Sequence, residues 1–130
     1  DLIMGILVGP QLGHDRLTFI YDYPASQAAL AQIRGPVASR FEAYMDGLEL
    51  CNGFHELANA AEQRARFERD LAERAKRGLP PMPMDERFLA ALEHGLPECS
   101  GVALGFDRLV MCATGAKHID AVLAFAFDRA

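Results

Sequence analysis

The sequence lacks the features that mark membrane-spanning and disulfide-stabilised proteins. Its longest apolar stretch, residues 2–8, is far below the roughly 20 residues that a membrane-spanning helix needs, and it lacks the flanks of a secretory signal. The three cysteines are an odd number without CxxC spacing, so neither a disulfide framework nor a zinc site is indicated. We expect a protein that does not enter a membrane and that works in a reducing cytoplasm.

An excess of positive charge and metal-binding histidine patterns are also lacking. The formal net charge of -5 argues against an extended phosphate-binding surface, because nucleic-acid-binding proteins concentrate Lys and Arg on one face. The most basic stretch, residues 64–77, alternates basic with acidic side chains, which is typical of a solvated helix face. The four histidines are scattered without HxxxH spacing, and we assign none of them to catalysis.

The length of 130 residues suits one domain, and the start at Asp1 suggests one that belongs to a longer protein. Strands are predicted over residues 17–23, 41–45, 48–50, 100–104 and 121–127, and helices over residues 1–8, 26–31, 60–77, 85–94 and 106–113. Residues 79–83, with three prolines, are predicted to form an extended linker. A hairpin and isolated strands mixed with helices predict an α+β fold with an antiparallel sheet flanked by helices.

The dipeptide Asp46-Gly47 between two strand-like runs is a strong signal for a hairpin with a two-residue turn. The predicted pairing sets residue 45 opposite 48, residue 44 opposite 49, and residue 42 opposite 51. Side chains alternate between the two faces of a strand, so one face should carry Glu42, Tyr44, Glu49 and Cys51. The other face is wholly apolar (Phe41, Ala43, Met45, Leu48 and Leu50) and is the predicted core face.

Two carboxylates that face the same way repel each other unless something neutralises them. Magnesium is often held by one or two carboxylates and completed by the phosphates of a substrate, so Glu42 and Glu49 suit a metal bound to ATP. The alternative is that both carboxylates point to water or pair with arginines elsewhere. The pattern alone favours this alternative.

Residues 52–56 follow the hairpin and place polar groups around an aromatic ring. Such a segment suits the wall of a pocket. Glu56, beyond Phe54, would select a ligand with an aliphatic stem and a terminal ammonium, as in lysine. A turn with ordinary solvated side chains fits this segment equally well.

Gly101, Ala103 and Gly105 alternate along a predicted strand, where missing side chains let a flat ligand approach the backbone. Arg108 follows in the first turn of a helix, near the positive end of its dipole, where a guanidinium suits a phosphate. The alternative is close packing of helix on strand, with Arg108 paired to an acid such as Asp107 or Glu42.

Together these segments resemble the catalytic domain of class II aminoacyl-tRNA synthetases of the aspartate, asparagine and lysine group. Residues 40–57 resemble the lysine-type amino-acid site and residues 101–108 the third signature motif, and the likeness extends to residues 23–27 and 127–130. Within the group, the tracts 77–80 and 99–103 resemble the truncated lysyl-tRNA synthetase paralogues that join β-lysine to a lysine of elongation factor P. Ala103 stands where lysyl-tRNA synthetases usually have glycine, and its methyl group could favour a β-amino acid.

The resemblance implies an ATP-dependent ligase that forms an aminoacyl adenylate from lysine or β-lysine and transfers it to elongation factor P, or to tRNA in the alternative. The implied ATP site consists of Glu42, Glu49, Gly105 and Arg108, with Mg2+ on the two glutamates and the γ-phosphate on Arg108. Arg108 is also the implied catalytic residue. The implied amino-acid site consists of Asn52, Gly53, Phe54, Glu56, Gly101 and Ala103.

The first and second signature motifs of the family, which supply the dimer interface and the arginine at the α-phosphate, are absent from these residues. The resemblance therefore implies that residues 1–130 are the C-terminal part of a catalytic domain whose full-length form is a homodimer. We expect residues 1–130 alone to be inactive as an enzyme. The alternative function for this part alone is a non-catalytic binding or oligomerisation module.

Overall fold

The computed structural model describes residues 2–127, so the resembling residues 128–130 lie outside the described part. The elements in chain order are η1 (Met4–Val8), η2 (Gly9–Gln11), β1 (Thr18–Pro24), η3 (Ala25–Gln27), β2 (Ile33–Arg34), β3 (Val37–Met45), β4 (Leu48–His55), α1 (Ala60–Lys76), α2 (Glu86–His94), β5 (Ser100–Leu104), α3 (Phe106–Thr114) and η4 (Ile119–Ala121). Among these elements, no helix is long and apolar enough to cross a membrane.

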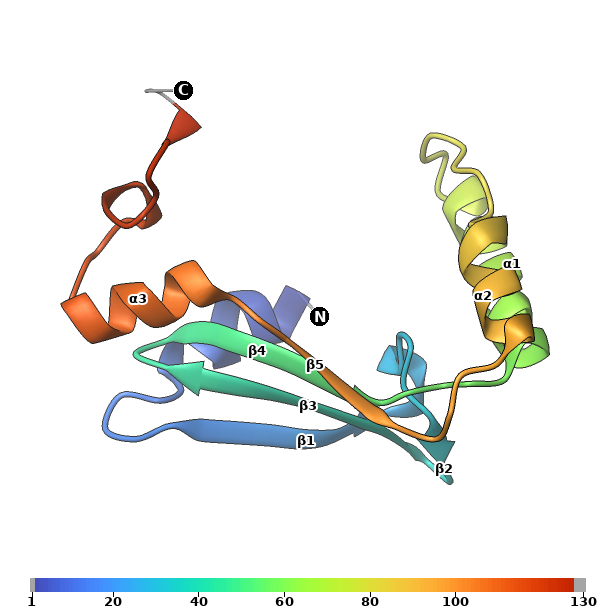
Figure 1. Ribbon diagram of the computed structural model, residues 1–130, viewed down its shortest axis with the longest axis horizontal. Coiled ribbons are helices and arrows are strands. Elements are labelled where there is room, and N and C mark those ends of the chain that lie inside the picture. The colour runs from blue at the N-terminus through green and yellow to red at the C-terminus, as the bar shows by residue number, and fades with distance from the viewer. Residues whose placement is uncertain (1, 128–130) are drawn as a thin grey trace.

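The strands form a five-stranded antiparallel sheet in the order β1-β3-β4-β5, with β2 paired to β3 at one end. Helix α3 lies beside the hairpin end of the sheet, whereas α1 and α2 stand as a pair beyond the opposite end (Figure 1). The predicted α+β fold with an antiparallel sheet and flanking helices is confirmed.

The β3–β4 hairpin turns at Asp46 and Gly47, whose φ angles of 50° and 76° match the turn type that two-residue hairpins favour. The predicted pairs 45 with 48 and 44 with 49 are present, but the next pairs are Ala43 with Cys51 and Glu42 with Asn52. Leu50 is therefore an extra residue in β4, which makes a β-bulge. The predicted pair 42 with 51 is wrong, because the bulge moves Cys51 to the opposite face.

The turn of the hairpin is held by the loop that follows η2. The amide of Asp46 donates to the carbonyl oxygen of Gly13 at 2.9 Å, and the amide of Gly47 donates to that of Leu12 at 2.8 Å. Gly13 is buried and has a φ of +77°, a conformation that favours glycine. This loop therefore fixes the end of the hairpin.

The core of the described part lies on the Glu42 face, so the prediction that the apolar face of the hairpin is the core face is wrong. The buried cluster consists of Tyr23, Ala28, Ala31 and Ala38, with Met4, Ile20 and Phe54 packed against it. On the opposite face Ala43 and Cys51 are buried, but Phe19, Val102 and Leu104 are at least half exposed. The physical reason is that the N-terminal segment packs on the Glu42 face.

Helices α1 and α2 both begin at side-chain caps. Asn59 accepts from the Glu62 amide and Asp85 from the Phe88 amide, each at 2.9 Å, which satisfies amides that a helix start leaves free. The rings of Phe67 and Phe88 lie 6.0 Å apart between α1 and α2. The helices predicted over residues 60–77 and 85–94 and the extended linker at 79–83 are confirmed.

Three local predictions are wrong. Residues 26–31 form only the single turn η3, which begins without a side-chain cap, because the buried Ala28 and Ala31 follow the sheet rather than a helix axis. Residues 121–127 contain no strand, and the first of them ends the turn η4, since no neighbouring strand pairs with them. The helical stretch predicted to end at residue 8 continues through Gly9 and Pro10 as η2.

Replacing Gly13 by alanine should destabilise the fold more than replacing Gly35. Both glycines have positive φ, but a Cβ at Gly13 would lie 2.5 Å from the backbone oxygen of Tyr44, whereas a Cβ at Gly35 would have no neighbour within 4 Å. Gly35→Ala should lower the free energy of unfolding by about 1 kcal/mol, because of its backbone conformation alone. Gly13→Ala should lower it by about 1–3 kcal/mol more, because of the added steric clash. Urea denaturation measures both, and equal losses would contradict the docking of this loop on the hairpin.

Candidate functional site

The sheet register gathers the predicted site residues of three segments on one face. Pairing of Glu42 with Asn52, of Asn52 with Ala103, and of Phe54 with Gly101 sets these side chains side by side across β3, β4 and β5. The face carries Arg40, Glu42, Tyr44, Glu49, Asn52, Phe54, Gly101 and Ala103. Segments far apart in the sequence therefore form one surface, which we call the site face.

Glu42 is the buried charge of the site face. Its Oε2 accepts hydrogen bonds from the hydroxyls of Tyr23 and Tyr44, each at 2.6 Å, and its Oε1 forms an ion pair with Nη2 of Arg40. Burial and the hydrogen bond to Glu42 raise the pKa of both tyrosines well above the ordinary value, so both hydroxyls stay protonated and donate. For Glu42 the structure thus shows the pairing with an arginine, and that arginine is Arg40.

Arg108 lies at the other end of the site face. It sits in the first turn of α3, as predicted, and its Nη1 donates to the backbone oxygen of Glu49 at 2.7 Å. Gly105 precedes this turn, and its amide donates to the carbonyl oxygen of Leu50 at 2.8 Å. Within residues 2–127, Arg108 pairs with neither Asp107 nor Glu42, and the Glu49 carboxylate has no hydrogen-bond or ion-pair partner.

These carboxylates fit a metal that arrives with phosphates better than a metal held by protein alone. Within residues 2–127, no three His, Cys, Asp or Glu side chains gather closely enough to hold an ion. Glu49 offers a carboxylate without a partner, and Glu42 keeps one lone pair on Oε1 beyond its three hydrogen bonds. One or two carboxylates with the rest of the shell from phosphates and water is how magnesium is usually bound.

The amino-acid half of the site face lies around Asn52 and Glu56. Oδ1 of Asn52 accepts from Nε of Arg40 at 3.2 Å, and Phe54 packs against the buried cluster. Glu56 follows β4 and lies over β5, since a Cβ added to Gly101 would be 2.3 Å from its Oε1. The missing side chain of Gly101 thus makes room for the Glu56 carboxylate.

Gly53 is the one predicted amino-acid-binding residue that the register places on the opposite face. It pairs with Phe41 and Val102, and a Cβ there would lie 2.4 Å from the Phe41 ring. Its missing side chain leaves room for this ring, and the register places Gly53 on the face opposite to that of Asn52.

Sequence reasoning placed Tyr44 on the face of Glu42 but did not identify Arg40 or Tyr23 beside it. Arg40 lies two residues before Glu42 in the same strand, so strand parity alone would have placed both on one face. Tyr23 comes from β1, where β1 shifts register against β3 between Tyr21 and Tyr23, and no local pattern indicates it.

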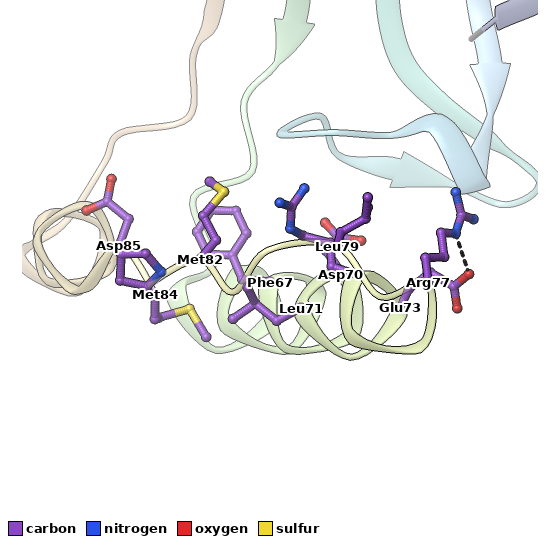
Figure 2. A pocket seen from close by; sticks show the side chains of 11 residues that line it. Phe67, Asp70, Leu71, Glu73, Arg77, Leu79, Met82, Met84 and Asp85 are labelled. Atoms are coloured by element: carbon purple, nitrogen blue, oxygen red, sulfur yellow. Dashed lines mark hydrogen bonds and ion pairs between the residues drawn. The ribbon is translucent and has the colours of Figure 1, made fainter.

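One hollow of the described part is separate from the site face. A cavity of about 650 Å3 lies between α1 and the linker to α2, lined by Phe67, Leu71, Leu79, Met82 and other residues of these two segments. Figure 2 shows their side chains along the helix, with Arg77 bonded to Glu73. No residue of the site face lines this cavity.

Comparison with known proteins identifies the family. The model of the tRNA synthetases of class II (D, K and N) matches residues 9–129. The chain belongs to the class II aminoacyl-tRNA synthetase family. The resemblance drawn from residues 40–57 and 101–108 is therefore confirmed.

Curated relatives point to one branch of this family. The protein named elongation factor P--(R)-beta-lysine ligase in Klebsiella pneumoniae (strain 342) is 59% identical to this chain, over 100% of this chain and 41% of the relative. The protein of the same name in Proteus mirabilis (strain HI4320) is 60% identical, over 95% of this chain and 39% of the relative. The protein of that name in Vibrio cholerae serotype O1 is 56% identical over 100% of this chain and 41% of its own length. The likeness to the paralogues is confirmed, and the chain spans about 41% of the length of such relatives.

The tyrosine contacts to Glu42 should make the fold sensitive to alkaline pH. Unfolded tyrosines ionise near pH 10, whereas the raised pKa keeps Tyr23 and Tyr44 protonated when folded. Above about pH 10 the unfolded state then binds fewer protons than the folded state, so the free energy of unfolding should fall as pH rises.

Replacing Tyr23 by phenylalanine should cost about 1–3 kcal/mol at neutral pH and should flatten this fall, as measured by urea denaturation between pH 7 and pH 11. Tyr21→Phe is the control, because Tyr21 is 71% exposed. If both variants kept the slope of the unmodified protein, the Tyr23 contact would not carry the effect.

Proposed function

We propose that the protein containing this chain uses ATP to activate a lysine-type amino acid and transfers it to a lysine of elongation factor P. The observation that carries the proposal is the gathering of Glu42, Glu49, Asn52 and Glu56 on or beside one sheet face, with Arg108 at its end. The names of relatives that are 56–60% identical over this segment support the choice of acceptor.

The amino-acid half provides groups that match a lysine-type ligand. The Glu56 carboxylate would bind the terminal ammonium, because a carboxylate paired with a cation forms strong charge-assisted hydrogen bonds. Phe54 would line the aliphatic stem. Asn52 and the wall formed by Gly101 and Ala103 would bind the end that reacts, where the Ala103 methyl group favours a β-amino acid.

The nucleotide half provides charge for the phosphates of ATP. Arg108 would bind the γ-phosphate, and Gly105 leaves room for the nucleotide beside it. Glu49 and Glu42 would hold Mg2+, which neutralises phosphate charge when it is bound. Both carboxylates lie on the side of β3 and β4 that carries Asn52, so nucleotide and amino acid would meet over one face.

The reaction then depends mainly on positioning and on charge neutralisation. A carboxylate oxygen of the amino acid attacks the α-phosphorus, the bond to the β-phosphate oxygen breaks, and pyrophosphate leaves. This step needs no general base, because the attacking carboxylate is already ionised. In the second step the acceptor lysine, once it has lost a proton, attacks the carbonyl carbon, an amide forms, and AMP leaves.

The rest of the protein would complete this site. We infer that segments beyond this chain bind the α-phosphate and form a homodimer, that the protein acts in the cytoplasm, and that residues 1–130 alone are inactive. Charging of tRNA with lysine is the alternative for the whole protein, and a non-catalytic binding module is the alternative for this part alone.

Mass spectrometry of elongation factor P should detect one added β-lysyl group per molecule after incubation with the full-length protein, ATP, Mg2+ and (R)-β-lysine. Glu49→Gln should lower the rate at least about tenfold by removing a carboxylate that would hold Mg2+ beside the phosphates. Glu68→Gln, on the exposed surface of α1, is the control. Charging of tRNA with lysine while elongation factor P stays unmodified would show that the alternative is correct.

Replacing Gly101 by alanine should weaken amino-acid binding and leave the fold intact. The three atoms nearest to the added Cβ would all belong to the Glu56 side chain, with its Oε1 at 2.3 Å, and a flexible carboxylate can move aside. Loss of this contact with the ammonium should raise the KM for β-lysine about tenfold to a hundredfold. Gly5→Ala, whose Cβ has no neighbour within 4 Å, is the control, and an unchanged KM in Gly101→Ala would refute the role of Glu56.

A further inference from the structure

We propose that Arg40 is a positioning residue that fixes the orientation of the Asn52 side-chain amide. This inference rests on the proposed function for its kinetic consequence, because Asn52 belongs to the proposed amino-acid half of the site. The geometry itself is independent of that function.

Arg40 is surrounded by protein acceptors. Its side chain is only 10% exposed, and Nε donates to Oδ1 of Asn52 at 3.2 Å, while Nη1 donates to the backbone oxygen of Gln27 at 3.0 Å. Nη2 pairs with Glu42, and the guanidinium carbon lies 4.5 Å from the centre of the Tyr23 ring. Contacts from β1, η3, β3 and β4 thus hold the guanidinium in one place.

A fixed guanidinium selects one of the two orientations of the Asn52 amide. Arginine only donates hydrogen bonds, whereas the asparagine side chain accepts through Oδ1 and donates through Nδ2. The opposite orientation would place the Nδ2 donors against the Nε donor of Arg40. Asn52 must therefore turn Nδ2 away from Arg40, and it offers N–H donors to an acceptor such as a ligand carboxylate.

Lysine at position 40 could not replace this arrangement. An ammonium is a point charge without the planar fork of arginine, so it can stay paired with Glu42 but cannot also hold Asn52 and Gln27 in the same geometry. Arg40→Lys therefore keeps the charge that Glu42 needs and releases the Asn52 amide.

Arg66 provides a matched control for a buried arginine. Its Nη1 donates to the backbone oxygens of Ala29 and Ala31, and its Nη2 pairs with Glu62. The Arg66 side chain is 8% exposed, close to the value for Arg40, but none of these partners belongs to the site face. Arg66→Lys should change stability without changing the orientation of Asn52.

The experiment is a double-mutant cycle in the full-length protein, read as the KM for β-lysine in adenylate formation. Arg40→Lys should raise this KM about tenfold in the otherwise unmodified protein but less than about twofold in the Asn52→Ala background, because coupled residues are not additive. Arg66→Lys should leave the KM unchanged in both backgrounds. An undiminished effect of Arg40→Lys in the Asn52→Ala background, or no effect in either, would overturn the proposal.

A second measurement separates this inference from the proposed function. In 15N–1H spectra, the side-chain amide signal of Asn52, assigned by its loss in Asn52→Ala, should shift in Arg40→Lys and stay in place in Arg66→Lys. An unmoved signal in Arg40→Lys would refute the positioning role. If the unmodified protein formed no adenylate while this signal shifted as expected, the proposed function would fail and the role of Arg40 would stand.

Discussion

A buried carboxylate that needs hydrogen-bond and ion-pair partners is the constraint on which this sheet depends. Glu42 is 6% exposed, and an unpaired carboxylate at such a position is strongly unfavourable. Its compensation comes from Arg40 and Tyr44 in the same strand and from Tyr23 in β1. Because these donors belong to two strands, satisfying one charge also fixes how β1 and β3 lie against each other beneath the N-terminal segment.

The bulge at Leu50 is the second constraint, and it determines which residues share the face of Glu42. With regular pairing Cys51 would lie opposite Glu42, and both Asn52 and Phe54 would turn to the other face. One extra residue reverses this parity beyond the bulge. The carbonyl oxygen of Leu50 accepts from the Gly105 amide. The bulged residue of β4 therefore also binds the residue that precedes α3.

The features that depend on local sequence were predictable, and those that depend on distant packing were not. The turn at Asp46-Gly47 and the cap at Asp85 follow from residues within a few positions, and both are present. The bulge has no local signal, because Leu50 fits a regular strand as well as a bulged one. Similarly, the apolar composition of residues 121–127 suits a strand, but no partner strand lies beside it within the described part.

For the site itself, strand parity correctly placed Glu42 and Glu49 on one face of the hairpin. The different surroundings of the two carboxylates are visible only in the folded structure. Glu42 is held by three donors, whereas the carboxylate of Glu49 has no partner within residues 2–127. A sequence pattern shows which charged residues share a face. Burial in the fold determines which charge is compensated by protein groups and which remains available to a ligand. Here burial depends on Tyr23 and on the N-terminal segment, both distant from the hairpin in sequence.

Under the proposed function, the amino-acid end of the site is held more rigidly than the phosphate end. Asn52 lies directly opposite Ala103 in the register, and Arg40 keeps its amide from turning to suit a ligand that binds slightly out of place. The Ala103 methyl group would therefore displace an amino acid relative to a donor that cannot follow, and discrimination follows when a rigid site leaves a misplaced group unpaired. Arg108 is exposed and held by one backbone oxygen, so the phosphate end can adjust to ATP while the amino-acid end selects.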